Sequence, residues 1–136
     1  MAWPRGVRRV VVDTSVVSYL LKGHSSAPQY REFLRGNLAG LSFMSLAELN
    51  RWPIERNWGD QRIAALREHL VSYIVLFPDE ETCRVWARLV SRKGRPVSVP
   101  DAWIAAAALQ FKCPLVTHNV QHFESIEGLS ILTVPV

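Results

Sequence analysis

The sequence has few cysteines, no long apolar run and no low-complexity segment, and each absence narrows what the protein can be. Its two cysteines, Cys83 and Cys113, match neither a disulfide framework nor a zinc site, so we expect both to be core thiols in a reducing compartment. No stretch approaches the roughly eighteen apolar residues of a membrane span, and the first residues lack the apolar core of a secretory signal. These features indicate a soluble cytoplasmic protein.

The remaining composition is that of an ordinary globular domain. Hydrophobic residues make up 49% and charged residues 21% of the chain, which excludes a disordered protein. At 136 residues the chain is long enough to bury a core without disulfides, and no linker or repeat divides it. We therefore expect a single domain over residues 1–136.

The charge of the chain is positive, with a formal net charge of +4 and a sequence pI near 9.5. Most of the basic residues are arginines, whose planar guanidinium group matches phosphate better than a lysine ammonium does. Nucleic acid is therefore a plausible partner. A small basic excess is also typical of a solvated surface, so charge alone leaves both interpretations open.

Strand and helix patterns alternate along the whole chain. Three consecutive valines at 10–12 predict a strand buried on both faces, and the apolar spacing after them predicts a helix over 14–22 that ends at Gly23. Further strands are expected over 40–44, 73–77, 115–117 and 130–134, and further helices over 27–35, from Ser45 to an interruption at Pro53, and over 60–71, 79–91 and 101–112, with a turn or short helix over 118–123. This alternation predicts an α/β fold with a mostly parallel sheet and helices on both faces.

Three carboxylates fall where strands end or helices begin. Asp13 ends the first strand, Glu48 lies in the first turn of the helix after the second strand, and Asp101 begins an apolar helix that leads into a later strand. In a parallel sheet these positions share one edge, where open α/β sheets bind ligands. Clustered carboxylates repel one another unless a cation neutralises them, and hard oxygen ligands favour Mg²⁺ or Mn²⁺. The pattern predicts a metal site.

Each of these carboxylates also has a purely structural interpretation. Asp13 and Asp101 are suited to cap helices, and Glu48 stands three residues after Ser45, which is the spacing of a capping box. Each such contact stabilises a helix by about 1 kcal/mol. The two aspartates lie beside almost wholly apolar segments, and this placement favours the metal site.

Four segments of the chain carry a family resemblance. They are VVVDTS ending at Ser15, MSLAEL ending at Leu49, PDAWIAAAA ending at Ala108 and LVTHNVQHF ending at Phe123. In their order and spacing they resemble the four motifs of the PIN domain, in the form found in VapC-type toxins of bacterial type II toxin–antitoxin (VapBC) modules. The resemblance covers about residues 9–135.

The resemblance implies a PIN-like three-layer α/β/α sandwich and a metal-dependent ribonuclease, inhibited by a VapB-type antitoxin protein and usually dimeric. It also implies that Asp13 and Asp101 hold Mg²⁺, with Mn²⁺ as a substitute, and that Glu48 completes the acidic set. The fourth segment departs from the family pattern, because His122 stands where many relatives have another acid. This leaves open the number of metal ions and, as an alternative, a weakened module that binds RNA or a partner without cleaving.

The candidate residues suit phosphodiester hydrolysis. The reaction needs negative charge on the phosphate neutralised and a water molecule made nucleophilic, and a carboxylate-bound Mg²⁺ does both. Glu48 is the candidate to orient that water or accept its proton. Ser15 and Asn119 are candidates to position the substrate through hydrogen bonds.

Histidine and tryptophan side chains carry weaker signals. His118 and His122 stand four residues apart, but no H-E-x-x-H pattern accompanies them, so zinc is disfavoured. Four of the five tryptophans fall into two pairs. Trp86 and Trp103 are expected in the core. Trp52 and Trp58 are candidates to contact either a partner protein or RNA bases.

A basic cluster precedes the third motif. It consists of Arg84, Arg88, Arg92, Lys93 and Arg95. Its spacing is typical of a solvated helix face, and it also suits a surface that guides RNA toward the carboxylates, which alone would repel it. A phosphoacceptor receiver domain shares this layout, but such a domain needs an acidic pair after its first strand, where Asp13 is followed by Thr14.

Overall fold

A five-stranded, fully parallel sheet forms the centre of the molecule in the computed structural model, which describes residues 8–135. The strands follow the spatial order β3-β2-β1-β4-β5. Their bounds are β1 Arg9–Val12, β2 Leu38–Ser42, β3 Ile74–Leu76, β4 Leu115–Val116 and β5 Ile131–Leu132. The predicted α/β fold with a parallel sheet is confirmed. Residues 1–7, where we expect no secretory signal, lie outside the described part of the chain.

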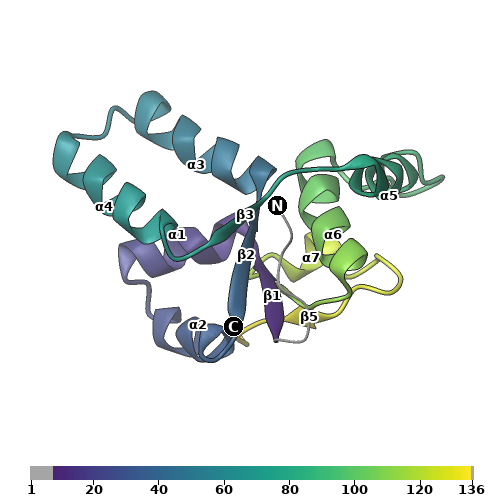
Figure 1. The fold of residues 1–136 in the computed structure, drawn as a ribbon, viewed down its shortest axis with the longest axis horizontal. Helices are drawn as coiled ribbons and strands as arrows, with labels where there is room; N and C mark the ends of the chain where they lie inside the picture. Colours follow the sequence, from purple (N-terminus) through teal and green to yellow (C-terminus); the bar gives the residue numbers. More distant parts are fainter. Residues whose placement is uncertain (1–7, 136) are drawn as a thin grey trace.

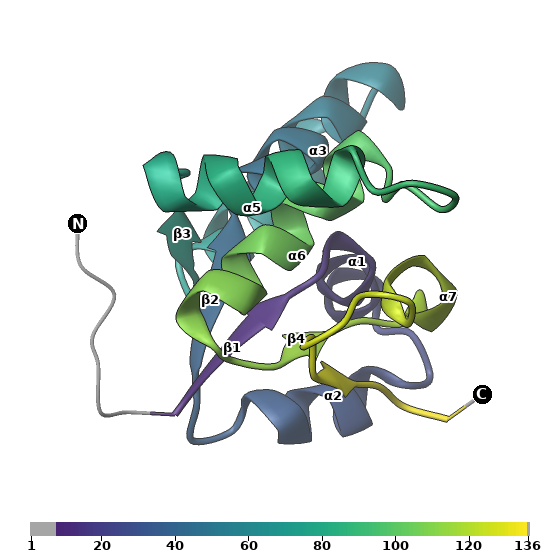
Figure 2. The ribbon, with the colours of Figure 1, turned by 90° about the vertical axis from the view of Figure 1, so that its right-hand side faces the viewer.

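Helices cover both faces of the sheet (Figure 1). Helices α1 to α4 lie on one face and α5 to α7 on the other, which Figure 2 shows from the side of α5. Their bounds are α1 Thr14–Lys22, α2 Ala27–Leu34, α3 Phe43–Glu55, α4 Asp60–Leu70, α5 Glu80–Val90, α6 Val99–Phe111 and α7 Val120–Phe123. The molecule is the three-layer α/β/α sandwich that we expected.

Strand β1 explains why a run of valines predicts a central strand. Val11 packs into the core beneath α5 and α6, whereas Val10 and Val12 pack into the core beneath α1 to α4. Because β1 pairs with β2 on one side and β4 on the other, both of its faces and both of its edges are covered. The residue after β1 therefore lies at the middle of the sheet's carboxyl edge.

Helix α6 returns the chain to this edge. Its residues 105–108, all alanine, are buried, and such small side chains let a helix approach the sheet closely. The helix ends at Phe111, shortly before β4 begins at Leu115. Since thirteen helical residues span about 20 Å, the start of α6 reaches the opposite edge, where the strands end.

The junction of β2 and α3 differs from the prediction. Strand β2 ends at Ser42 rather than at Met44, and α3 begins at Phe43. The Ser42 hydroxyl caps this helix by accepting a hydrogen bond from the Met44 N–H at 3.1 Å. Ser45 lies inside the helix, so the predicted capping box between Ser45 and Glu48 is wrong.

Pro53 does not interrupt α3, which continues to Glu55, so the predicted break is also wrong. Proline lacks an N–H and would normally break a helix interior. Here it stands in the last turn, where the helix loses a single backbone hydrogen bond. The remaining boundaries lie within about two residues of those expected.

The four side chains expected in the core differ in burial. Cys113 is buried as expected, but Cys83 is exposed on α5, so the prediction of a core thiol is wrong for Cys83. Trp86 stacks on Trp103 with ring centroids 4.7 Å apart. Both tryptophans are half-buried at the margin of the core rather than inside it.

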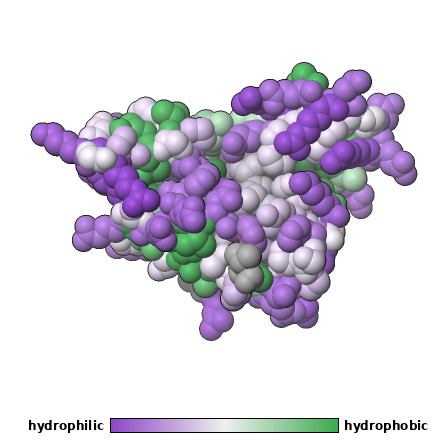
Figure 3. Space-filling model, turned by 180° about the vertical axis from the view of Figure 1, so that it is seen from behind, coloured by the Kyte–Doolittle hydropathy of each residue, from purple (hydrophilic) through white to green (hydrophobic). Residues whose placement is uncertain are grey.

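The surface is mostly polar. Seen from behind, hydrophilic side chains spread over much of the molecule with small hydrophobic patches between them (Figure 3). The most exposed large apolar side chains are Ile54, Val71 and Phe77, which come from three different segments. Among residues 8–135 no helix combines the length and the apolar character needed to cross a membrane.

Candidate active site

Asp13 lies at the carboxyl end of β1 and is 4% exposed. Its Oδ1 atom accepts a hydrogen bond from the Thr14 N–H at 2.9 Å, so Asp13 caps α1 as the structural interpretation expects. Its Oδ2 atom accepts from the hydroxyls of Ser15 at 2.8 Å and Thr117 at 2.7 Å. Each hydroxyl in turn accepts from a backbone N–H of the segment after β4. These contacts direct both hydroxyl protons at Asp13 and hold its side chain in one orientation.

Glu48 reaches the same edge from α3. Its Oε1 atom accepts a hydrogen bond from the Thr14 hydroxyl at 2.8 Å. That hydroxyl lies 2.7 Å from the Oγ atom of Ser45, which is fully buried. Ser45 and Glu48, which we expected to pair with each other, therefore both contact the start of α1. This link places Glu48 next to the residue that follows Asp13.

Asp101 is the third residue of α6, and Ser98 is the residue that precedes the helix, so Asp101 is not an N-cap. Its Oδ2 atom accepts a hydrogen bond from the Ser98 hydroxyl at 2.9 Å and lies 3.1 Å from Nδ1 of His122. The Asp101 side chain is 22% exposed. His122 thus contacts one of the predicted metal ligands directly.

The three carboxylates act on one another electrostatically. Burial raises the pKa of Asp13, and the charge of Asp101 raises it further, against the hydrogen bonds that favour the ionised form. Burial also raises the pKa of Glu48, and the charges of Asp13 and Asp101 add to this effect, while the Thr14 hydroxyl opposes it. Glu48 is thus linked to the residue after Asp13 through the Thr14 hydroxyl, and Asp101 lies close enough for its charge to act on both carboxylates.

The donor atoms of this acidic cluster fit a divalent cation. A carboxylate offers about four acceptor positions, of which Asp13 uses three, and the described contacts of Asp101 all fall on Oδ2. Within residues 8–135, no three histidine, cysteine, aspartate or glutamate side chains form a ready-made metal cage. Mg²⁺ does not need one, because it is usually held by one or two carboxylates and keeps several water molecules. Repulsion between the carboxylates favours such an ion.

The predicted substrate-positioning residues have different surroundings. The Ser15 hydroxyl contacts Asp13, as described, and lies inside the acidic cluster. The Asn119 side chain is exposed beside it, and its backbone N–H donates to the Thr117 hydroxyl at 3.0 Å. Ser15 is thus placed to orient a ligand of the cluster, and Asn119 is placed to meet a molecule that approaches from solvent.

Two threonines at this site were not among the predicted residues. Thr14 holds Glu48, and Thr117 holds Asp13. The position of Thr117 carries a sequence signal, because it ends the predicted strand over 115–117, and in the structure it follows β4 just as Asp13 follows β1. That signal is readable only once β1 and β4 are known to be neighbours, with Val12 opposite Val116.

A basic cleft adjoins the acidic cluster. It has a volume of about 340 Å³ and contains Asp101 and His122 together with Arg92 and Arg95 from the loop after α5. Arg92 donates hydrogen bonds to the Arg95 carbonyl oxygen and to the carbonyl and hydroxyl oxygens of Ser125, all at 2.9 Å. These partners are neutral, so they leave the positive charge of Arg92 beside the cleft.

The rest of the predicted basic cluster is a solvated helix face. Arg84 pairs with Glu80 on the exposed side of α5, and Arg88 and Lys93 are exposed. Of the five basic residues, only Arg92 and Arg95 line the cleft that contains Asp101. The guiding surface that we predicted is therefore smaller than the cluster.

His118 and His122 do not form a zinc pair. The Nδ1 atom of His118 lies 2.6 Å from the Tyr30 hydroxyl, whereas Nδ1 of His122 faces Asp101. The two rings therefore have different partners, although they are four residues apart.

Fold and site together define a class of protein, a parallel α/β/α domain whose converging carboxylates are suited to bind a divalent cation at the ends of the strands. The family model described as PIN domain matches residues 10–129 of the chain. The chain therefore belongs to the PIN domain family, as its four motifs indicate.

Individual relatives agree with this assignment. The chain is 32% identical over 124 residues to Ribonuclease VapC1 of Haemophilus influenzae strain R2866, covering 88% of this chain and 92% of that protein. It is 30% identical over 130 residues to Ribonuclease VapC5 of Mycobacterium tuberculosis strain ATCC 25618 / H37Rv, covering 91% and 92%. Its fold is similar to the structure of VapBC-1 from nontypeable Haemophilus influenzae, with a TM-score of 0.77 and 29% identity over 92% of this chain and 97% of that one.

Proposed function

We propose that this chain is an endoribonuclease that requires a divalent metal ion, Mg²⁺ or Mn²⁺, and hydrolyses RNA phosphodiester bonds as the toxin of a type II toxin–antitoxin pair. One observation supports the proposal above all others. Asp13, Glu48 and Asp101 interact at one sheet edge in a chain 32% identical to a protein named Ribonuclease VapC1. The partner and the roles of individual residues are part of the same proposal.

The proposed partner is a VapB-type antitoxin protein, and the proposed assembly is a homodimer or a hetero-oligomer with that antitoxin. Support comes from the similar structure of VapBC-1 from nontypeable Haemophilus influenzae. Because cellular RNA is the proposed substrate, we propose the cytoplasm as the place of action.

In the proposed mechanism Asp13 and Asp101 would hold the metal ion. When bound, a divalent cation neutralises phosphate charge and makes a water molecule a better nucleophile. Glu48 would accept a proton from that water, and its raised pKa suits this role because it makes the carboxylate a stronger base. The Thr14 hydroxyl would keep Oε1 of Glu48 oriented. Ser15 would hold Asp13 in place, and Asn119 would contact the substrate.

The test of this proposal is the replacement of each aspartate by its neutral isostere. We expect Asp13→Asn and Asp101→Asn each to lower metal-dependent RNA cleavage by at least about a hundredfold, since each removes charge stabilisation from the reacting phosphate. Circular dichroism and thermal melting should show the fold intact, because asparagine can cap α1 in place of Asp13 and Asp101 is not an N-cap. Asp60→Asn, a change at an exposed acid on α4, is the matched control. Wild-type cleavage rates in both site variants would refute the proposal.

A second candidate function is a PIN-fold module that binds RNA or a partner without cleaving. It is favoured by the contact of His122 with Asp101, which occupies one face of a proposed metal ligand. A sensitive cleavage assay with Mg²⁺ and with Mn²⁺ separates the two candidates. Measurable RNA binding without turnover in either metal would favour the module.

A further inference from the structure

A second pocket lies among α1, α3 and α4, away from the acidic cluster. It has a volume of about 320 Å³, at the lower end of the range of about 300–1,000 Å³ typical of ligand pockets. Nine residues line it: Ser18, Leu21, Lys22, Trp52, Arg56, Trp58, Arg62, Ala65 and Leu66. Three of them are cationic and none is acidic, so the pocket is suited to an anion.

Two guanidinium groups in this pocket lie over indole rings. The guanidinium of Arg56 lies 4.7 Å from the ring centroid of Trp52, and that of Arg62 lies 4.0 Å from that of Trp58. Such a pair presents a flat cationic surface on which a nucleobase stacks, while the guanidinium edges donate hydrogen bonds to phosphate. The two Arg–Trp pairs therefore suit both halves of a nucleotide.

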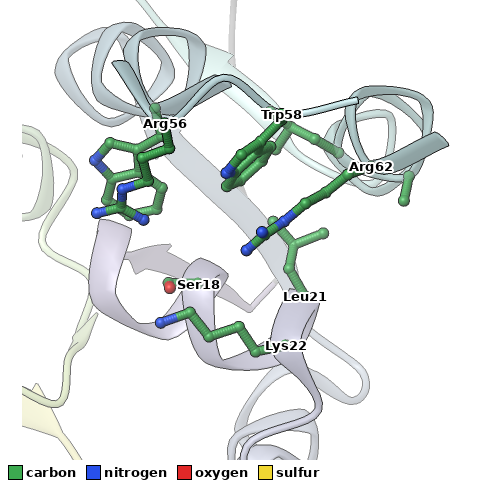
Figure 4. A pocket seen from close by; sticks show the side chains of 9 residues that line it. Ser18, Leu21, Lys22, Arg56, Trp58 and Arg62 are labelled. Carbon is green, nitrogen blue, oxygen red and sulfur yellow. The ribbon is translucent and has the colours of Figure 1, made fainter. Parts of the chain in front are cut away.

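The polar groups of the pocket converge. Figure 4 shows the Lys22 amino group, the Ser18 hydroxyl and the guanidinium ends of Arg56 and Arg62 directed toward the same space. The ring nitrogen of Trp58 lies on the edge that faces this space. That nitrogen is buried and has no hydrogen-bond partner among the described residues, an uncommon state for a donor. The converging cationic and hydroxyl groups, rather than this buried N–H, are what the pocket presents to a ligand.

The pocket continues the acidic cluster along two helices. Ser18 stands four residues after Thr14 on α1, and Trp52 stands four residues after Glu48 on α3. Residues four apart share a helix face and lie about 6 Å apart along the axis. A nucleic acid strand held at the carboxylates therefore meets the pocket after about one nucleotide.

We infer that this pocket binds one nucleotide of single-stranded RNA beside the phosphodiester held at the acidic cluster. The inference rests on the proposed function for the identity of the ligand. An acidic peptide would also satisfy the positive charge. Continuity with the carboxylates and the stacking surfaces favour RNA, because a peptide carboxylate uses neither.

The test measures binding without cleavage. The probe is a fluorescein-labelled single-stranded RNA hexanucleotide of mixed sequence with 2′-O-methyl sugars, and fluorescence anisotropy in EDTA gives its Kd. We expect Arg56→Gln/Arg62→Gln to raise the Kd at least tenfold and Lys22→Gln, which changes one exposed side chain at the end of α1, to raise it at least threefold. The matched control is Arg31→Gln/Arg67→Gln, which removes two charges from exposed arginines outside the pocket and should raise the Kd less than twofold. Thermal melting checks that each variant is folded.

Two results would overturn the inference. The first is a Kd for Lys22→Gln and for the folded pocket double variant equal to that of the control. The second is that a glutamate-rich peptide binds the wild type but not Arg56→Gln/Arg62→Gln, while the RNA probe binds both proteins with equal Kd. Wild-type protein that binds RNA through the pocket but cleaves nothing would refute the proposed function alone, and cleavage with pocket-independent binding would refute this inference alone.

Discussion

His122 adds an imidazole ring to the acidic cluster of Asp13, Glu48 and Asp101. Its Nδ1 atom lies 3.1 Å from Oδ2 of Asp101, and a metal ion at Asp101 would lie close to this ring. We expect His122→Asp to raise the affinity for Mn²⁺ about tenfold, because ligand charge tunes the affinity of oxygen sites over orders of magnitude. Isothermal titration calorimetry of the two proteins checks this, with His122→Asn as the control that removes the ring without adding charge. Equal Kd values for His122→Asp and His122→Asn would contradict it.

His69 makes stability depend on pH. Burial lowers its pKa below the ordinary value of 6.5, and the charge of Arg31 lowers it further. The unfolded chain therefore takes up the proton first as pH falls, so the contribution of His69 is fully present above pH 6.5 and is lost as pH falls through the lower folded-state pKa. We expect the free energy of unfolding to decrease as pH is lowered from 7 to 5, and His69→Gln to reduce this decrease. Urea denaturation at several pH values measures both.

Tyr73 provides the control for this experiment. Its hydroxyl lies 2.8 Å from Nε2 of His69. Because burial is the main cause of the lowered pKa of His69, Tyr73→Phe should leave the pH dependence in place. A pH dependence that disappears in Tyr73→Phe, or that survives unchanged in His69→Gln, would show that burial of His69 is not its source.

The residues of the site were predictable to different degrees. Asp13 and Asp101 stand out in the sequence because each adjoins an almost wholly apolar segment. The capping box proposed for Glu48 was wrong, since its partner is the Thr14 hydroxyl. Thr117 was missed because its contact with Asp13 joins two strands that are far apart along the chain. Sequence patterns report local contacts well and cross-strand contacts poorly.

At the level of elements, a proline inside α3 lowers the stability of the protein. Pro53 lies inside the helix and leaves the Leu49 carbonyl without its i+4 donor. Pro53→Ala restores the N–H, and we expect it to increase the free energy of unfolding by about 1–2 kcal/mol. Removing proline from a helix stabilises the folded state. The gain is reduced because alanine gives the unfolded chain more conformational freedom than proline does. Urea denaturation provides the measurement.

Pro28 is the matched proline for this test. It lies in the first turn of α2, where a missing N–H costs nothing. Pro28→Ala should therefore leave stability unchanged or lower it by up to about 1 kcal/mol. An equal change in stability from the two substitutions would argue against a helix-specific cost at Pro53.

The elements themselves were predictable where the stop signals were strong. Helix α1 has the predicted bounds because Asp13 caps its start and Gly23, at a φ of 68°, ends it in a conformation that glycine adopts at little cost. The boundary between β2 and α3 was misplaced because Phe43 and Met44 are apolar and fit either element. The hydrogen bond that sets this boundary is the cap by Ser42. Ser42 and Ser45 are both suited to cap a helix, and the sequence alone does not show which of them does so.

At the scale of the whole molecule, the sequence predicted the layers but not where its charges would gather. The alternation of elements is enough to predict a parallel sheet with helices on both faces, since few other arrangements bury such segments. The charge of +4 is an average over the chain. In the folded molecule, the cations that line the basic cleft and the second pocket lie on two sides of the acidic cluster. Three other arginines pair with acids three or four residues away along the chain, namely Arg35, Arg51 and Arg84. The paired arginines contribute little to long-range attraction, so binding of RNA should depend on the others.

This distribution predicts how RNA binding responds to salt. Five cations, Lys22, Arg56, Arg62, Arg92 and Arg95, line the cleft and the pocket, and each phosphate neutralised on a single strand contributes about −0.7 to the slope of log K against log salt. A short single-stranded RNA should therefore bind with a slope near −3.5 between about 50 and 200 mM salt, measured by fluorescence anisotropy in EDTA. Arg56→Gln/Arg62→Gln should reduce the slope to roughly −2, and Arg31→Gln/Arg67→Gln should leave it unchanged. A slope that falls equally in the two double variants would mean that net charge, and not the placement of these five cations, attracts RNA.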